Sequence, residues 1–241
     1  MKPVEGAAYY DCQAQARGIA TVADVQDLAR RQAPVYRRIL RRWLPASRDA
    51  AIYEAACGPG ILLHFLRDEG YRNLSGSDSS GPVIALARQA QLPVALADSI
   101  EDLRRYPAAT WDCIVAIDFV EHLPKDRLLE FFAETARTVK SGGVLILRAP
   151  NADSPLVTRN LFNDITHYWA YTTVATRALL SAAGFGRTEC VDESLAAVTR
   201  LRWVALPVMM LSRALIRALL WAATRENVRH LGASVFVAAW R

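Results

Sequence analysis

The chain has 241 residues, of which 52% are hydrophobic, and it carries a formal net charge of +5. This composition excludes disorder across the whole chain, and the length fits one domain with a full core plus an appendage. The basic excess is mild, so it allows an anionic substrate or a membrane surface, and we expect no nucleic-acid partner.

The first 48 residues are predicted to form an N-terminal helical cap on a main domain that spans 49–241. Apolar and basic residues alternate at helical spacing from Asp24 to Trp43, with Pro34 near the middle. Because proline interrupts a helix, we predict two helices joined near Pro34. The N-terminus lacks the apolar run of a secretory signal, which favours a cytoplasmic protein.

The stretch at 51–66 reads as a strand, a glycine turn and a helix. A short apolar run ends on Glu54, the turn contains Gly58 and Gly60, and an apolar helix follows. Such a turn lets a small polar ligand approach the backbone beside the unpaired amides of a helix N-terminus. The dinucleotide fingerprint lacks its third glycine and the phosphate loop lacks its lysine, so another nucleotide-like cofactor is indicated.

Acidic residues recur at a regular step after this turn. Asp78, Asp98 and Asp118 each follow a short apolar run, and twenty residues separate each from the next. That step suits a strand, a helix and short loops, so each acid is expected at the carboxyl end of a parallel strand. Ligands of open α/β sheets bind at that edge, where these acids and Glu54 would line one crevice.

The remaining pattern predicts a doubly wound, mostly parallel sheet in an α/β protein. An amphipathic helix is expected at 125–139, a central strand at 144–147, and two further strands at 188–192 and 234–240, the last of them antiparallel. The four cysteines form no Cys-x-x-Cys pair, so we expect reduced thiols, no disulfide framework and no metal site.

Four motifs in this region resemble those of class I S-adenosylmethionine-dependent methyltransferases. Glu54-Ala-Ala-Cys-Gly-Pro-Gly60 is similar to the first motif and Gly76-Ser-Asp78 to the second, whose acid holds the ribose hydroxyls. Ala97-Asp98-Ser-Ile100 is similar to the third, whose acid meets the adenine amino group while the apolar neighbour packs on the ring. The fourth ends in Glu121-His122-Leu123, which is typical of the small-molecule branch that includes ubiquinone-biosynthesis O-methyltransferases.

The resemblance implies a seven-stranded, Rossmann-like sheet and S-adenosyl-L-methionine as the cofactor. Ala56 departs from the family pattern, because the family usually has its first glycine there. Alanine is tolerable at a negative φ and obstructive at a positive φ, and we expect cofactor binding to be retained. The expected cofactor-binding residues are Glu54, Ala55, Ala56, Cys57, Gly58, Gly60, Asp78, Ser79, Asp98, Ser99, Ile100, Asp118 and Phe119.

The segment at 161–171 mixes aromatic residues with polar side chains, as a pocket for an organic acceptor requires. We expect His167 or His122 to act as the catalytic base, because histidine accepts protons near neutral pH. The alternative is structural: Asp164 and Thr166 cap this region, His167 is a structural histidine, and His122 only holds its loop by a hydrogen bond. The expected substrate-binding residues are Asp164, Tyr168, Trp169 and Tyr171.

A helical insertion is expected at about 200–224, between the last two strands. Its apolar stretch at 201–221 nearly has the length of a membrane span, but Arg213 and Arg217 disfavour insertion. Three interpretations remain open: a helix buried on the domain, a cap over a lipophilic pocket, and an interfacial membrane helix.

Taken together, these residues predict a methyltransferase for a small acceptor of lipophilic, sugar or phenol type, with O-methylation as the reaction. A non-catalytic binding protein of the same fold is the alternative, and a nucleic-acid methyltransferase is a weaker one. The expected partner is the small-molecule acceptor. Peripheral contact with the inner membrane face through 201–221 and a homodimer both stay open.

Overall fold

The computed structural model describes residues 18–193 and 202–241, and in α9 the side chains from Leu206 onward. Its seven strands form one sheet in the order β3-β2-β1-β4-β5-β7-β6. The first five strands are parallel, whereas β7 runs antiparallel to both β5 and β6. The predicted doubly wound, mostly parallel sheet with an antiparallel last strand is confirmed. The strands are β1 (Ala51–Ala55), β2 (Asn73–Asp78), β3 (Val94–Leu96), β4 (Trp111–Ile117), β5 (Val139–Pro150), β6 (Arg187–Asp192) and β7 (Ser234–Trp240).

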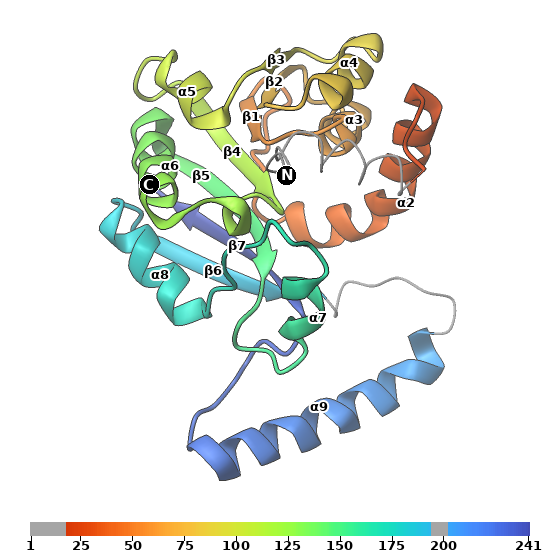
Figure 1. The fold of residues 1–241 in the computed structure, drawn as a ribbon, viewed down its shortest axis with the longest axis vertical. Helices are drawn as coiled ribbons and strands as arrows, with labels where there is room; N and C mark the ends of the chain where they lie inside the picture. The colour runs from red at the N-terminus through yellow and green to blue at the C-terminus, as the bar shows by residue number, and fades with distance from the viewer. Residues whose placement is uncertain (1–17, 194–201) are drawn as a thin grey trace, which may run out of the picture.

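Helices cover both faces of this sheet (Figure 1). One core cluster joins the sheet to α2 (Val22–Leu40), α3 (Ile61–Asp68) and α4 (Gly81–Gln89). The other joins it to α5 (Ser99–Arg104), α6 (Lys125–Thr138) and α8 (Thr173–Ala182). The short η1 (Val120–His122) follows β4, and α7 (Val157–Phe162) follows β5. The loops after β1, β2, β3, β4 and β5 therefore gather at one edge of the sheet.

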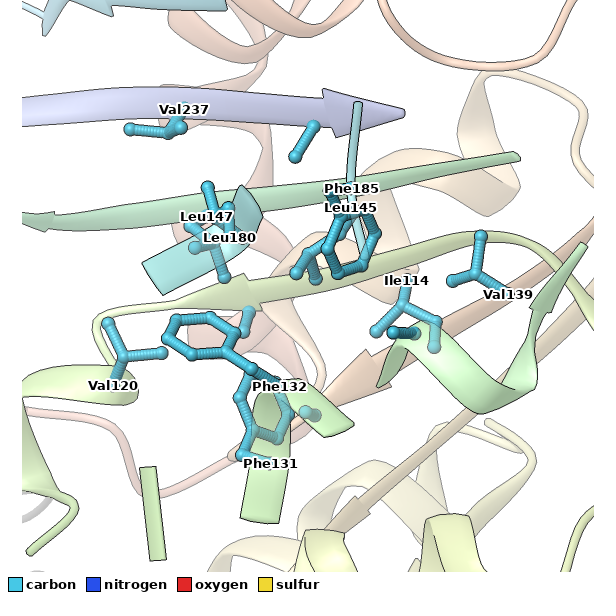
Figure 2. Packing of buried hydrophobic residues seen from close by; sticks show 14 of the residues in the cluster. Ile114, Val120, Phe131, Phe132, Val139, Leu145, Leu147, Leu180, Phe185 and Val237 are labelled. Carbon is cyan, nitrogen blue, oxygen red and sulfur yellow. The ribbon is translucent and has the colours of Figure 1, made fainter. Parts of the chain in front are cut away.

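The second core cluster shows how the central strands serve two faces. Side chains alternate along a strand, so Ile114 of β4 and Leu145 of β5 turn toward this cluster, whereas Ile146 belongs to the other. Figure 2 shows Phe131 and Phe132 of α6 packed beneath these strands. This packing fixes the carboxyl end of β4, which is followed by Asp118, Phe119 and the η1 turn with His122.

The helix α2 corrects the prediction of two helices joined near Pro34. One continuous helix runs from Val22 to Leu40, with Pro34 inside it on the exposed side. Its N-terminus is closed by a capping box, in which the Thr21 side chain and Asp24 each accept the other's backbone amide. Its buried side chains lie in the core cluster that includes α3, and Tyr36 meets Phe65 at 5.3 Å between ring centroids. Burial on both sides of the proline offsets the lost hydrogen bond.

The helix α9 (Arg202–Thr224) occupies the predicted insertion between β6 and β7. None of the residues in Leu206–Thr224 is buried, so the interpretation of a helix buried on the domain is wrong. Figure 1 shows α9 standing apart below the sheet. By length and composition, this is the one helix among the described residues that could cross a membrane.

Candidate functional site

The turn between β1 and α3 has three left-handed residues at alternating positions. The φ angles of Ala56, Gly58 and Gly60 are 51°, 52° and 86°. A Cβ atom on Gly60 would lie 2.3 Å from Cδ1 of Leu92, so only glycine fits there. Ala56 has the positive φ that we considered unfavourable, although such values are still accessible to an L-residue at a cost.

Backbone amides of the turn are held by β2 and by the start of α5. Asp78 Oδ2 accepts from the Gly58 amide at 2.9 Å, and the Cys57 amide donates to the Ser77 carbonyl at 2.9 Å. Ser99 Oγ accepts from the Ala56 amide at 2.9 Å. Asp78 and Ser99, both predicted cofactor contacts, therefore shape the turn. Burial raises the pKa of Asp78 above its usual value.

Glu54 is the buried acid beneath this turn. Its side chain is only 4% exposed and accepts a hydrogen bond from the Leu63 amide in the first turn of α3. Its Oε2 atom is buried and has no hydrogen-bond partner among the described residues. Burial, opposed by the Leu63 amide, raises the pKa of Glu54 well above its usual value. A buried acceptor without a partner is costly, so this oxygen suits a ligand that donates.

Glu54 near the end of β1, Asp78 at the end of β2 and Asp118 after β4 lie on three neighbouring strands, at the same edge of the sheet. Asp98 follows β3, which is the next strand. Asp118 has a φ of 52° and is ion-paired with Arg148 of β5. Burial raises the pKa of Tyr36, and the nearby charges of Glu54 and Asp118 raise it further. Tyr36, a residue of α2, therefore lies near the acids at this edge of the sheet. Sequence reasoning missed it, because at helical spacing it reads as a core residue.

Asp98 is engaged by the helices on its side of the sheet. Its Oδ1 atom accepts from the Ile100 amide at 2.9 Å and pairs with Arg127 at 2.8 Å. The Ile100 side chain is fully buried in the core. Ser79 is exposed, and Phe119 packs edge-on against Phe131 at 5.2 Å. Contacts between these residues and a cofactor stay predictions.

A hydrogen-bond chain connects η1 to the predicted acceptor segment. Thr166 Oγ1 donates to Asp164 Oδ1 at 2.6 Å and lies 2.8 Å from His122 Nδ1. Because the threonine hydrogen goes to the carboxylate, we assign the other contact to an Nδ1–H of His122, which leaves the lone pair on Nε2. Burial and the neighbouring His167 lower the pKa of His122 to about 4. The sequence placed Thr166 only in a structural cap with Asp164, and its contact with His122 was not predicted.

His167 and Glu121 complete this cluster. The rings of His122 and His167 lie 4.5 Å apart, and His167 Nε2 is 4.0 Å from Glu121 Oε1. The Nδ1 atom of His167 lies 3.1 Å from the Leu161 carbonyl, so it carries the hydrogen. Glu121 is 1% exposed, and burial followed by the charge of Asp118 raises its pKa. The ligand atoms of the three residues lie within 4.8 Å of one another, so they could also hold a metal ion.

The predicted aromatic residues have different surroundings. Tyr168 is 57% exposed, whereas the Lys125 ammonium lies 4.3 Å from the centre of the Trp169 ring. Trp169 Nε1 and the Tyr171 hydroxyl are buried without partners among the described residues. Burial and the charge of Glu121 raise the pKa of Tyr171 to about 12. Tyr171 also borders a small apolar cavity formed with Val120 and with side chains of β5, α6, α8 and β7.

Comparisons with known proteins agree with this geometry. The family model described as "Methyltransferase domain" matches residues 28–189. A methyltransferase from Archaeoglobus fulgidus, described as dependent on S-adenosylmethionine, is 20% identical with a TM-score of 0.66, over 97% of this chain and 99% of its own. One from Mesorhizobium loti is 16% identical with a TM-score of 0.58, over 86% and 98%. Phosphoethanolamine N-methyltransferase 2 from Haemonchus contortus, bound to S-adenosylmethionine, is 16% identical with a TM-score of 0.58, over 85% and 51%. Among curated proteins, no significant match was found.

Proposed function

Because the chain belongs to the methyltransferase-domain family, we propose that it transfers the methyl group of S-adenosylmethionine to a hydroxyl group of a small acceptor. We choose a hydroxyl as the methylated group because of the hydrogen-bond chain from Asp164 through Thr166 to His122. A hydroxyl must lose its proton when it becomes a methyl ether, and this chain presents a neutral imidazole that can accept one.

The cofactor fits the turn after β1. When bound, S-adenosylmethionine supplies a methyl group already activated by the sulfonium. The partnerless Oε2 of Glu54 would receive the ammonium of its methionine end. No atom lies within 4 Å of a Cβ position on Gly58, so the turn is open on that side. We assign the ribose hydroxyls to Asp78 and the adenine amino group to Asp98.

His122 would act through its Nε2 atom. Thr166 and Asp164 hold the ring in the tautomer that has its lone pair there, as the third group of a catalytic triad orients its base. The low pKa of His122 keeps the ring neutral near pH 7, so the base is ready without prior deprotonation. His167 packs against the ring at 4.5 Å and limits its movement.

The acceptor is proposed to have an apolar or aromatic body. Val120, two residues before His122, and Tyr171, four residues after His167, border the apolar cavity. Trp169 and Tyr168 come from the same segment as His167. Apolar walls with a few convergent polar groups orient such a molecule and exclude water from the transfer. Phenols and lipid-linked sugars combine a hydroxyl group with such an apolar or aromatic body.

The test is methyl transfer from isotope-labelled S-adenosylmethionine to panels of phenols, sugars and amines. We expect labelled ethers from hydroxyl acceptors and at least a hundredfold loss in His122→Asn, with cofactor binding retained. Binding without transfer to any panel would favour a non-catalytic binding protein. Transfer that a chelator abolishes and a divalent metal restores would assign Glu121, His122 and His167 to a metal ion in place of a base.

A further inference from the structure

The helix α9 carries an exposed stripe of large apolar side chains. Its members, which we call the apolar stripe, are 57–70% exposed and follow a spacing of three or four residues. At about 100° per residue this spacing places them on one side of the helix. The stripe consists of Val208, Leu211, Leu215 and Leu219.

The arginines of α9 turn the other way, toward the protein. Arg213 forms an ion pair with Asp192 at the end of β6, and Asp192 is only 3% exposed. Arg217 donates to the carbonyls of Val228 at 3.2 Å and Arg229 at 2.7 Å. A surface helix of a soluble protein normally turns its apolar side inward. Here the polar side is tethered by these contacts, and the apolar side is exposed.

Cationic and aromatic side chains lie at the C-terminal end of α9 and just after it. Arg225 and Arg229 are exposed there, and Glu226 is the exposed acid of the segment after α9. Trp221 is 53% exposed near the end of the helix, and the Arg225 guanidinium lies 4.7 Å from the centre of its ring. Tryptophan and arginine beside an apolar face are the side chains that favour the headgroup region of a membrane.

We propose that α9 is an interfacial anchor that lays its apolar stripe into an anionic lipid surface, with its axis in the plane of the membrane. A spanning orientation would pull Arg213 away from Asp192 and carry two arginines into hydrocarbon. A second copy of the chain packed on the stripe would bring its own arginines toward Arg225 and Arg229, which repel them. Anionic lipid headgroups complement that charge.

The anchor is joined to the segment that carries the acceptor residues. Ser154 Oγ donates to the Leu231 carbonyl at 2.8 Å, and the Asn151 side chain donates to the His230 carbonyl at 2.8 Å. The same segment exposes Phe162 and Ile165 by 77% and 85%. A membrane-bound α9 would therefore hold this segment near the lipid surface, where a lipid-borne acceptor is available.

The experiment is flotation of the full-length protein with vesicles of phosphatidylcholine alone or with phosphatidylglycerol added. We expect binding to the anionic vesicles at least tenfold stronger than to the neutral ones, weakening as salt is added. The variant Leu211→Gln/Leu215→Gln/Leu219→Gln should lower the partition coefficient at least thirtyfold. The matched control is Leu129→Gln, which changes a leucine that is 56% exposed on α6 and should leave binding unchanged.

Circular dichroism and binding of S-adenosylhomocysteine show whether each variant is folded, independently of the membrane result. Equal binding by the triple variant and the wild type would overturn the proposal. Absence of vesicle binding would overturn it too. If light scattering then showed a dimer that the triple variant loses, the occupant of the stripe would be a second copy.

Discussion

His122 donates its Nδ1–H to Thr166 Oγ1 over 2.8 Å, and Thr166 in turn donates to Asp164. The two residues are 44 positions apart, yet this contact decides which ring nitrogen of His122 carries the hydrogen. The proposed catalytic base therefore depends on a threonine from another loop.

Replacing Thr166 with valine should slow methyl transfer while leaving the cofactor site intact. Without the hydroxyl, the imidazole loses its tautomer preference and its orientation, and we expect a fall in kcat of about 30-fold. Calorimetry with S-adenosylhomocysteine should give an unchanged Kd. Thr110→Val, which removes a hydroxyl bonded to the Pro107 carbonyl away from the site, is the control. Equal rates for Thr166→Val and the wild type would contradict the relay.

Ala56 is expected to lower the stability of the turn. Its φ of 51° is left-handed, so Ala56→Gly should raise the free energy of unfolding by about 0.5–1 kcal/mol, net of the added freedom of the unfolded chain. The neighbouring variant Ala55→Gly, at the last residue of β1, should lower it by about 0.5–1 kcal/mol. Urea denaturation of both proteins measures these changes. A loss of stability in Ala56→Gly would show that the residue is not strained.

Gly60 and Gly58 should respond differently to alanine. Gly60→Ala meets Leu92 as well as an unfavourable φ, so we expect a loss of about 2–4 kcal/mol. Gly58→Ala meets no atom within 4 Å and should lose only about 1–2 kcal/mol. The double variant Gly60→Ala/Leu92→Ala tests the cause in a denaturant titration. If the contact with Leu92 is the cause, the double variant should lose less unfolding free energy than the sum of the losses in the two single variants.

The stability of the protein should fall in acid because of His122. The folded state lowers its pKa to about 4, whereas the unfolded chain has about 6.5, so protonation favours unfolding. The stabilising contribution of neutral His122 is complete above about pH 6.5 and is lost as the pH falls toward 4. Relative to His122→Gln, the wild type should therefore lose stability across that window.

Chemical denaturation at several pH values measures this difference. Glu121→Gln is a control with the opposite sign, because burial raises the pKa of Glu121. Relative to that variant, the wild type should lose stability as the pH rises above the value of about 4.3 for an unfolded glutamate. If the unfolding free energies of the wild type and His122→Gln changed with pH in parallel, the assignment of a buried, neutral His122 would be contradicted.

The sheet was predictable from sequence because short apolar runs ending in acids mark parallel strands buried on both faces. Glu54, Asp78 and Asp118 were placed correctly at one edge for that reason. Pro34 misled the prediction, since burial around Tyr36 outweighs the local preference of proline. The exposure of the apolar stripe could not be foreseen, because an apolar helix reads the same whether its partner is protein or lipid.

The details of the site depend on contacts between distant segments. The pairing of His122 with Thr166 depends on how the loops after β4 and β5 meet, and that of Asp118 with Arg148 depends on the register of β4 against β5. No local pattern specifies either contact. The positive φ of Ala56 could not be predicted from the residue type, because alanine usually has a negative φ. Sequence reasoning therefore predicted the residue types at the site, but it missed Tyr36 and the contact of Thr166 with His122.

Titration calorimetry of the full-length protein with S-adenosylhomocysteine tests the central claim most directly. A site built from Glu54 and the turn at 56–60 predicts one molecule bound per chain, with an affinity that Glu54→Ala lowers at least tenfold while the protein stays folded. Protein that is folded by circular dichroism but gives no binding heat at any temperature, and no protection from thermal unfolding, would contradict it.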